Sequence, residues 1–127
     1  MNITRITPQI RTTNLERAIS FYTELGFGLD FRYEDFYAGI SIGTRGLHLK
    51  LVDDADPSID FVRDGGHLHL HFTVEDIQST FDEINTKATI VENICNRPWG
   101  LTEFVIEDPD GHTLYFSQPT PKDSERN

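Results

Sequence analysis

The sequence has 127 residues, which is enough for one domain with a hydrophobic core, and no stretch approaches the roughly 20 apolar residues of a membrane span. Its formal net charge of −10 comes from acidic residues spread along the chain, and such a field repels phosphate backbones, which argues against nucleic-acid binding. Cys95 is the only cysteine, which excludes an internal disulfide, and the absence of a signal-peptide layout predicts a cytoplasmic protein with no membrane attachment.

The first half of the chain predicts one helix between strands. Alternation of apolar and polar residues over 3–12 predicts a strand. Asn14 is suited to begin a helix because its side chain accepts backbone hydrogen bonds, and Gly26 is suited to end it. The apolar residues of this helix, at the spacing i, i+4, i+7, are Leu15, Ile19 and Tyr22. Three further strands are predicted over 28–33, 37–42 and 47–52.

The second half repeats this order. A strand over 67–74 precedes a helix that begins behind Asp76, and its apolar residues at the same spacing are Ile77, Phe81 and Ile84. Three more strands are predicted over 89–93, 101–107 and 112–117. Two βαβββ modules result, 3–52 and 67–118, joined by a linker rich in Asp, Pro and Gly (53–66). We expect one domain, 1–118, and a flexible C-terminal tail, 119–127.

Several segments resemble a known family. The sequence 14–22, then Leu25-Gly26-Phe27, and later 107–111 look like the signature elements of the vicinal-oxygen-chelate superfamily, which includes glyoxalases, fosfomycin-resistance proteins and extradiol dioxygenases. The segments 30–31, 34–36, 98–100 and 103–104 are similar to its bleomycin-resistance branch. The resemblance covers nearly the whole chain and implies an α+β fold, in which the two modules form a cup-shaped, partly open mixed barrel.

Alternation also sorts side chains by face, because successive residues of a strand point to opposite sides of the sheet. The residues expected to pack in the core are Ile6, Ile10, Leu47, Leu49, Leu51, Leu68, Leu70, Phe72, Val74, Leu114 and Phe116. The residues expected to face the cup are Thr7, Gln9, Arg11, His48, Lys50, Val52, His67, His69, His71, Thr113, Tyr115 and Ser117.

The resemblance implies four metal-binding positions in the cup, and these fall on Thr7, Lys50, His69 and Tyr115. Only His69 is a competent ligand, because the lysine ammonium has three donors and no lone pair. We therefore expect no metal and no cofactor, and a binding protein in place of an enzyme. The alternative is a metal-dependent lyase, transferase or dioxygenase that uses His67, His69 and His71, since two histidines two apart on a strand can chelate zinc, with a carboxylate such as Glu103 or Glu107 completing the site.

A cup without metal is suited to a flat ligand, because aromatic side chains stack on planar rings. The aromatic candidates are Phe31, Phe36, Tyr37, Phe61 and Trp99; the polar candidates are His48, Lys50, His69, His71, Tyr115 and Glu103. Trp99 lies between Pro98 and Gly100, and we expect it on a fixed loop at the groove mouth; the alternative is a structural lid over the core. The resemblance implies that a flat, cationic antibiotic or metabolite is bound unaltered. Arg11, Lys50 and the cup histidines leave an anionic or metal-chelated ligand open, and a sensor or partner module is a third reading.

Pro8 interrupts the first predicted strand, where it cannot donate a ladder hydrogen bond, which is typical of an edge strand. In the bleomycin-resistance branch the first strand is exchanged between subunits. The resemblance therefore implies a homodimer with two grooves, each built from both chains. An unswapped dimer and a monomer are the alternatives.

Overall fold

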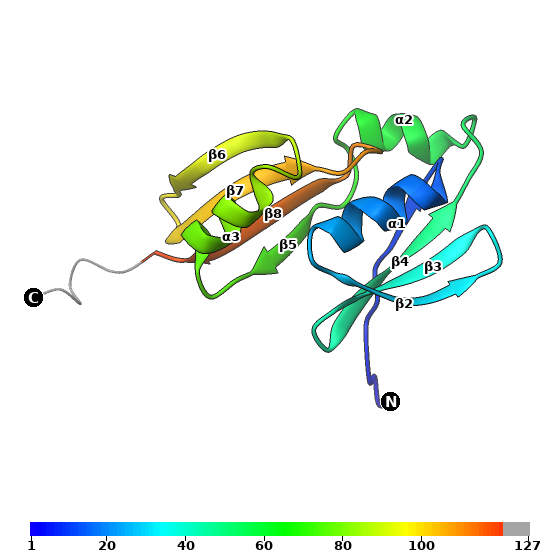
Figure 1. Ribbon diagram of the computed structural model, residues 1–127, viewed down its shortest axis with the longest axis horizontal. Coiled ribbons are helices and arrows are strands. Elements are labelled where there is room, and N and C mark those ends of the chain that lie inside the picture. The colour runs from blue at the N-terminus through cyan, green and yellow to red at the C-terminus, as the bar shows by residue number, and fades with distance from the viewer. Residues whose placement is uncertain (121–127) are drawn as a thin grey trace, which may run out of the picture. The chain divides into compact units, whose positions relative to one another are not determined.

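A computed structural model describes residues 1–120 of the chain. The chain divides into two compact units, the first from Met1 to Gly66 and the second beginning at His67, and each is described by itself. Each unit holds one four-stranded mixed sheet that is not closed, with helices (Figure 1). This is the predicted α+β arrangement of two βαβββ modules. No helix within residues 1–120 is long and apolar enough to cross a membrane.

The sheet of unit 1 has the strand order β1-β4-β3-β2. Its strands are β1 (Gln9–Thr12), β2 (Gly28–Tyr33), β3 (Tyr37–Ile42) and β4 (Arg45–Leu51). β1 runs parallel to β4, and the other neighbours are antiparallel. The parallel pair is possible because helix α1 (Leu15–Glu24) forms part of the connection that follows β1.

Helix α1 covers one face of this sheet. Its first turn is capped by Asn14, whose side-chain oxygen accepts a hydrogen bond of 3.0 Å from the Arg17 N–H, and Gly26 follows its end with a φ of 109°, a conformation that favours glycine. The side chains that it buries against β2, β3 and β4 are Leu15, Ala18, Ile19 and Tyr22. The buried side chains of the sheet are Ala38, Ile40, Leu47 and Leu49, while Leu51 is half-buried.

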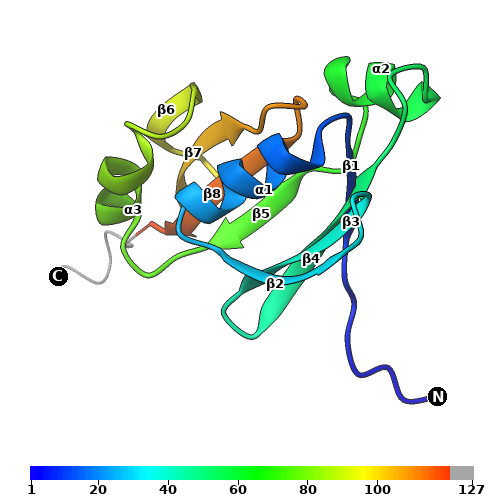
Figure 2. The ribbon, with the colours of Figure 1, turned by 45° about the vertical axis from the view of Figure 1, so that its right-hand side comes forward.

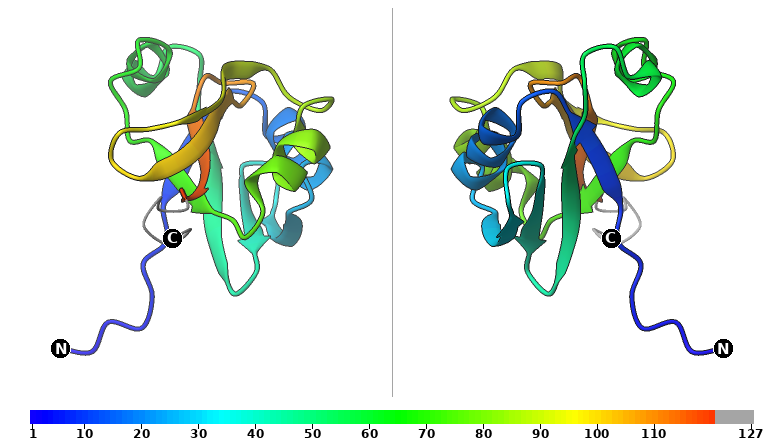
Figure 3. Two further views of the ribbon diagram at one scale, coloured as in Figure 1. Left: turned by 90° about the vertical axis from the view of Figure 1, so that its left-hand side faces the viewer. Right: turned by 90° about the vertical axis from the view of Figure 1, so that its right-hand side faces the viewer.

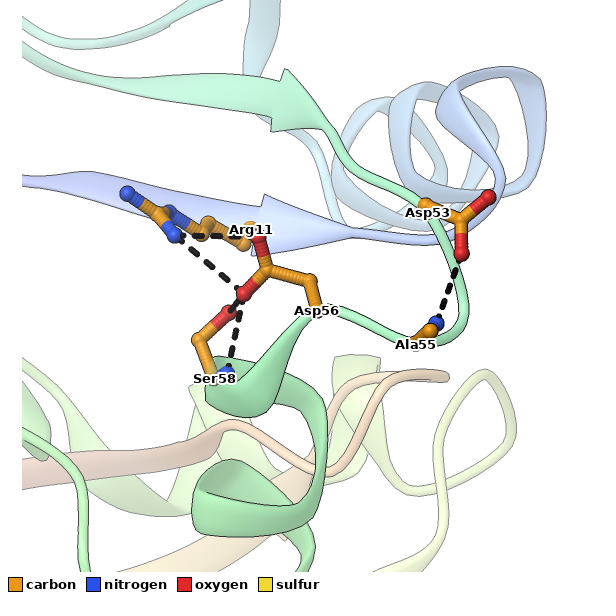
Figure 4. A network of polar contacts seen from close by, with 5 residues as sticks. All are labelled: Arg11, Asp53, Ala55, Asp56 and Ser58. Carbon is orange, nitrogen blue, oxygen red and sulfur yellow. Dashed lines mark hydrogen bonds and ion pairs between the residues drawn. The ribbon is translucent and has the colours of Figure 1, made fainter.

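The segment 53–66 was predicted as a linker, but it contains a helix, α2 (Pro57–Arg63). The local signals for it are present. Asp56 precedes Pro57 at the first turn, and the apolar residues Ile59 and Val62, three apart, are buried. The Asp56 carboxylate accepts hydrogen bonds from the Ser58 N–H (2.9 Å) and from the Ser58 hydroxyl (2.5 Å) (Figure 4).

The first strand is shorter than predicted. β1 begins at Gln9, and residues 1–8 run away from the sheet as an extended segment (Figures 2 and 3). The prediction that Ile6 packs in the core is wrong, because 88% of this residue is exposed, whereas Ile10 is buried as expected. Pro8 marks the boundary: it has no N–H to donate, and its carbonyl accepts the last bond of the ladder, from the His48 N–H at 2.9 Å.

Unit 2 repeats the topology of unit 1. Its strands, in the sheet order β5-β8-β7-β6, are β5 (Leu70–Thr73), β8 (Thr113–Pro119), β7 (Leu101–Glu107) and β6 (Ile90–Asn96). β5 runs parallel to β8, and helix α3 (Ile77–Ile84) contacts β7 and β8. Asp76 caps α3 by accepting a hydrogen bond from the Ser79 N–H at 3.0 Å.

Four phenylalanines form the centre of the unit 2 core. Phe104 has no exposed surface; its ring meets Phe81 of α3 edge to face at 5.2 Å and stacks on Phe116 at 5.3 Å. Phe116 in turn stacks on Phe72 at 5.0 Å. The prediction that Leu68 is buried is wrong, because 72% of it is exposed. Strand pairing begins only at Leu70, so Leu68 precedes the sheet.

The last strand extends further along the chain than predicted. β8 ends at Pro119, and the Thr120 N–H donates to the Gly100 carbonyl at 2.8 Å. The rest of the predicted tail, 121–127, lies outside the described residues.

Candidate functional site

One face of the unit 1 sheet points away from α1 and gathers polar and aromatic side chains. Tyr37 lies directly opposite Lys50, and Gly39 opposite His48, so these residues share a face, whereas Leu47 and Leu49 point to the helix. On the neighbouring strands Gln9 pairs with His48, Arg11 with Lys50, and Phe31 with Gly39. We call this surface the Lys50 face; it consists of Gln9, Arg11, Phe31, Tyr37, Gly39, His48 and Lys50.

Three rings on the Lys50 face contact one another. Phe31 lies 6.2 Å from Tyr37 in a stacked arrangement and 5.3 Å from His48 edge to face. The Tyr37 hydroxyl lies 2.9 Å from His48 Nδ1 and accepts a hydrogen bond of 3.1 Å from the Gln9 side-chain amide. Phe31, Tyr37 and His48 are ligand candidates predicted from the sequence, and the structure brings them together.

Gly39 makes this arrangement possible. A Cβ atom at Gly39 would lie 2.2 Å from the nearest carbon of the Phe31 ring, so the ring rests directly on the glycine backbone. Any larger residue would displace the ring. The face therefore carries a preformed aromatic surface whose position is set by a backbone contact.

Two cationic side chains border these rings. Arg11 forms an ion pair with Asp56, at 3.3 Å from Nη1 to Oδ1. Lys50 is half-buried, and within residues 1–120 its ammonium takes part in no side-chain hydrogen bond or ion pair. Hydrogen bonds from the Ser58 hydroxyl and N–H, followed by the charge of Arg11, hold the pKa of Asp56 below its ordinary value of 3.8.

In unit 2 the candidate residues His69, His71 and Tyr115 form a stack. The ring of His71 lies 4.3 Å from Tyr115 at an interplanar angle of 9°, and that of His69 lies 5.6 Å from Tyr115 at 22°. His67 instead meets His69 and His112 edge to face at 5.2 and 5.5 Å. Imidazoles that stack on a phenol ring do not converge on one point as metal ligands do.

The residues present do not fit the divalent metal that the resemblance implies. Of the four positions, Thr7 and Lys50 belong to unit 1, and His69 and Tyr115 belong to unit 2. A lysine ammonium offers no electron pair to a dication, and threonine and tyrosine hydroxyls are weak neutral ligands. Within residues 1–120 no group of three or more His, Cys, Asp or Glu side chains is arranged to hold a metal ion.

Trp99 lies on the turn between β6 and β7. The turn is closed by hydrogen bonds from the Arg97 N–H to the Leu101 carbonyl (2.7 Å) and from the Gly100 N–H to the Arg97 carbonyl (3.1 Å), and Gly100 has a φ of 91°. The indole is 67% exposed, which argues against a lid over the core of its own chain. The Arg97 guanidinium lies 5.9 Å from the indole centroid, in cation–π contact.

The same guanidinium holds two carboxylates. Arg97 Nε donates to Glu103 Oε2 at 2.6 Å, and its Nη2 donates to Glu92 Oε1 at 2.8 Å. Both hydrogen bonds raise the pKa of Arg97, and the bond to Glu92 contributes more than the bond to Glu103. Glu103 is 2% exposed, and its Oε1 has no hydrogen-bond partner within the described residues. Glu103 was predicted as a site residue and Arg97 was not, although opposite charges six residues apart across a turn were a usable signal.

Two aromatic candidates lie outside the ring cluster of the Lys50 face. Phe36 meets Tyr33 edge to face at 5.6 Å, and Phe61 of α2 packs beside Gly66. They are 43% and 58% exposed. No ring contact joins either of them to Phe31, Tyr37 or His48 in the described part of the chain.

Comparison with known proteins identifies the family. Residues 2–116 match the model of the Glyoxalase/Bleomycin resistance protein/Dioxygenase superfamily. No curated protein matches the chain at a significant level.

Solved structures of similar fold include a glyoxalase/bleomycin resistance protein/dioxygenase from Alicyclobacillus acidocaldarius, with 20% identity, 92% of each chain covered and a TM-score of 0.74. A bleomycin-binding protein in complex with bleomycin shares 20% identity over 91% of this chain and 98% of its own, with a TM-score of 0.72. The bleomycin-binding protein of Streptomyces verticillus in complex with copper(II)-bleomycin shares 18% identity over 96% and 99%, with a TM-score of 0.71. The chain described here thus belongs to the glyoxalase/bleomycin resistance protein/dioxygenase superfamily.

Proposed function

We propose that this chain is a non-catalytic protein that sequesters a flat, cationic antibiotic or metabolite. The observation that carries the proposal is Trp99, an exposed indole held by a hydrogen-bonded turn beside two carboxylates. Two solved structures of the same fold are described as bleomycin-binding proteins in complex with their ligand. A flat heteroaromatic ring stacked on the indole gains about 0.5–1.5 kcal/mol beyond its buried area.

The charged side chains beside Trp99 favour a cationic ligand. Arg97 contributes one positive charge, whereas Glu92 and Glu103 contribute two negative charges, so the group keeps one net negative charge. The whole chain carries −10, which raises the local concentration of a cationic ligand. The remaining candidates offer further rings for ligand contact within their own units, Phe36 and Phe61 in unit 1 and His69, His71 and Tyr115 in unit 2.

The residues at the positions implied for a metal support a non-catalytic protein. Lys50 occupies a position where relatives with metal chemistry need an electron pair, and Cys95 has no neighbouring histidine in the sequence that would activate it as a nucleophile. The alternative is a metal-dependent lyase, transferase or dioxygenase built on His67, His69 and His71. Elemental analysis of the dialysed protein separates the two, since about one zinc or iron per chain would support the enzyme.

Bleomycin is the probe for the proposed ligand class. Trp99 is the only tryptophan, so intrinsic tryptophan fluorescence reports on this residue alone. We expect metal-free bleomycin to change that fluorescence and to release or absorb heat in calorimetry. The Trp99→Ala variant should bind at least about tenfold more weakly, because the stacking surface is lost.

The matched control is Val91→Ala, which truncates another exposed apolar residue of unit 2 and should leave the affinity unchanged. If the wild-type protein shows neither a fluorescence change nor heat with bleomycin, this ligand is rejected. If Trp99→Ala and Val91→Ala bind equally well, Trp99 is not part of the site.

We further propose a homodimer whose N-terminal strands are exchanged and whose two grooves are each built from both chains. Support comes from the segment before Pro8, where Ile3 and Ile6 are 76% and 88% exposed. Together with Thr4, Arg5 and Arg45 they line a pocket of about 300 Å³. Apolar side chains on an extended arm are stabilised when a second copy buries them.

Light scattering tests the dimer. The chain mass is 14.5 kDa, so we expect a particle of twice that mass. The double variant Ile3→Ser, Ile6→Ser should shift the population toward monomer, while Val91→Ser, an exposed apolar position of unit 2, should not. A wild-type mass equal to one chain would exclude both the dimer and the shared grooves.

A further inference from the structure

Two cations share one sheet face in a strongly acidic protein. Arg11 of β1 and Lys50 of β4 are register partners, so their side chains leave the sheet on the same side. Like charges on facing positions of neighbouring strands repel each other. An anion bound between them would relieve this repulsion.

The two cations are not equally neutralised. Asp56 pairs with Arg11, and its own position is fixed by hydrogen bonds from Ser58 (Figure 4). Lys50 has no comparable partner within residues 1–120. Lys50 is half-buried, and its ammonium keeps three donors available for an oxyanion.

The rings beside Lys50 are fixed in place. Tyr37, directly opposite Lys50, is held by its hydrogen bonds with His48 and Gln9. Phe31 stacks beside Tyr37 and rests on Gly39. A planar ligand ring can pack on this surface without reordering the side chains, and preorganisation of that kind favours affinity.

We propose that the Lys50 face binds an aromatic acid: the acidic group accepts hydrogen bonds from Lys50 with the charge of Arg11 beside it, and the ring packs against Tyr37 and Phe31. This inference goes beyond the proposed function, because it gives the Lys50 face of unit 1 a ligand of its own, an aromatic acid, in addition to the cationic ligand proposed at Trp99 of unit 2. On the Lys50 face the lysine supplies a positive charge, and an ammonium offers no electron pair to a dication.

The test compares two probes of equal shape. 2-Naphthoate carries a carboxylate, and 2-naphthamide is its neutral counterpart. In calorimetry we expect the wild-type protein to bind the naphthoate at least about tenfold more tightly, since hydrogen bonds to charged groups are stronger than neutral ones. Lys50→Met keeps the aliphatic stem and removes the charge. This variant should lose the preference for the naphthoate without losing affinity for the naphthamide. Lys87→Met, at an exposed lysine of unit 2, should leave the preference intact.

Each other outcome decides against the inference. Equal affinities for the two probes in the wild-type protein would overturn it, as would an unchanged preference in Lys50→Met or in a second variant, Lys50→Gln, used if the first fails to fold. The bleomycin titration of Trp99 is read separately. Loss of the naphthoate preference with an intact Trp99 response would reject only this inference, and the reverse result would reject only the cationic ligand.

Discussion

Replacing Phe104 by alanine is expected to lower the free energy of unfolding by about 3–5 kcal/mol, which is the usual cost of deleting a buried phenylalanine ring. Phe104 has no exposed surface, and its ring contacts both Phe81 and Phe116. Its removal therefore leaves a cavity between α3 and the sheet. Urea unfolding measured by circular dichroism gives the difference.

Phe61→Ala is the matched control, because it deletes the same ring from a position that is 58% exposed. We expect a change within about 0.5 kcal/mol for that variant. If the two variants were equally stable, Phe104 would not be the centre of the unit 2 core, and the packing of α3 on β7 and β8 would be in error.

The elements that the sequence predicted well are those whose signals are local. Asn14 and Asp76 cap α1 and α3 as expected. In each cap the side-chain oxygen and the N–H that donates to it lie only three residues apart in the sequence. The division between Leu47 and Leu49 on one face and the polar residues on the other follows from the two-residue period of any strand.

The errors arise where a strand needs a partner. Alternation at Ile6 and Leu68 is as regular as within the true strands, but within residues 1–120 no neighbouring strand pairs with either residue. A pattern of side chains does not encode the presence of the second strand. Helix α2 was missed for a different reason: its seven residues are too few to display a helical period, and only its cap and proline mark it.

The candidate site depends on register, which the sequence did not reveal. An irregularity between Leu29 and Phe31 inserts Asp30 and reverses the alternation of β2, which places Phe31 on the Lys50 face opposite Gly39. Without this bulge Phe31 would point toward α1. The contact of Tyr37 with His48 likewise follows from pairing across β3 and β4, so single residues were predictable while their cluster was not.

Replacing Arg97 by methionine is the second change with a large expected effect. Glu103 is buried, and Arg97 supplies its hydrogen bond at Oε2. Removal of the guanidinium leaves a carboxylate in the protein interior without its counter-charge, which is far more costly than the loss of an exposed ion pair. We expect the thermal unfolding midpoint to fall by roughly 10 °C.

The double variant Arg97→Met, Glu103→Gln distinguishes this cause from a loss of packing. Glutamine keeps the shape of Glu103 and removes its charge, so the double variant should be more stable than Arg97→Met alone, although it carries one more substitution. Glu92→Gln serves as the control, since Glu92 holds the same guanidinium from a largely exposed position and its loss should change the midpoint little. An Arg97→Met midpoint equal to that of Glu92→Gln would show that the Glu103 carboxylate does not depend on Arg97. In that case the charge arrangement beside Trp99, on which the preference for a cationic ligand is argued, would have to be revised.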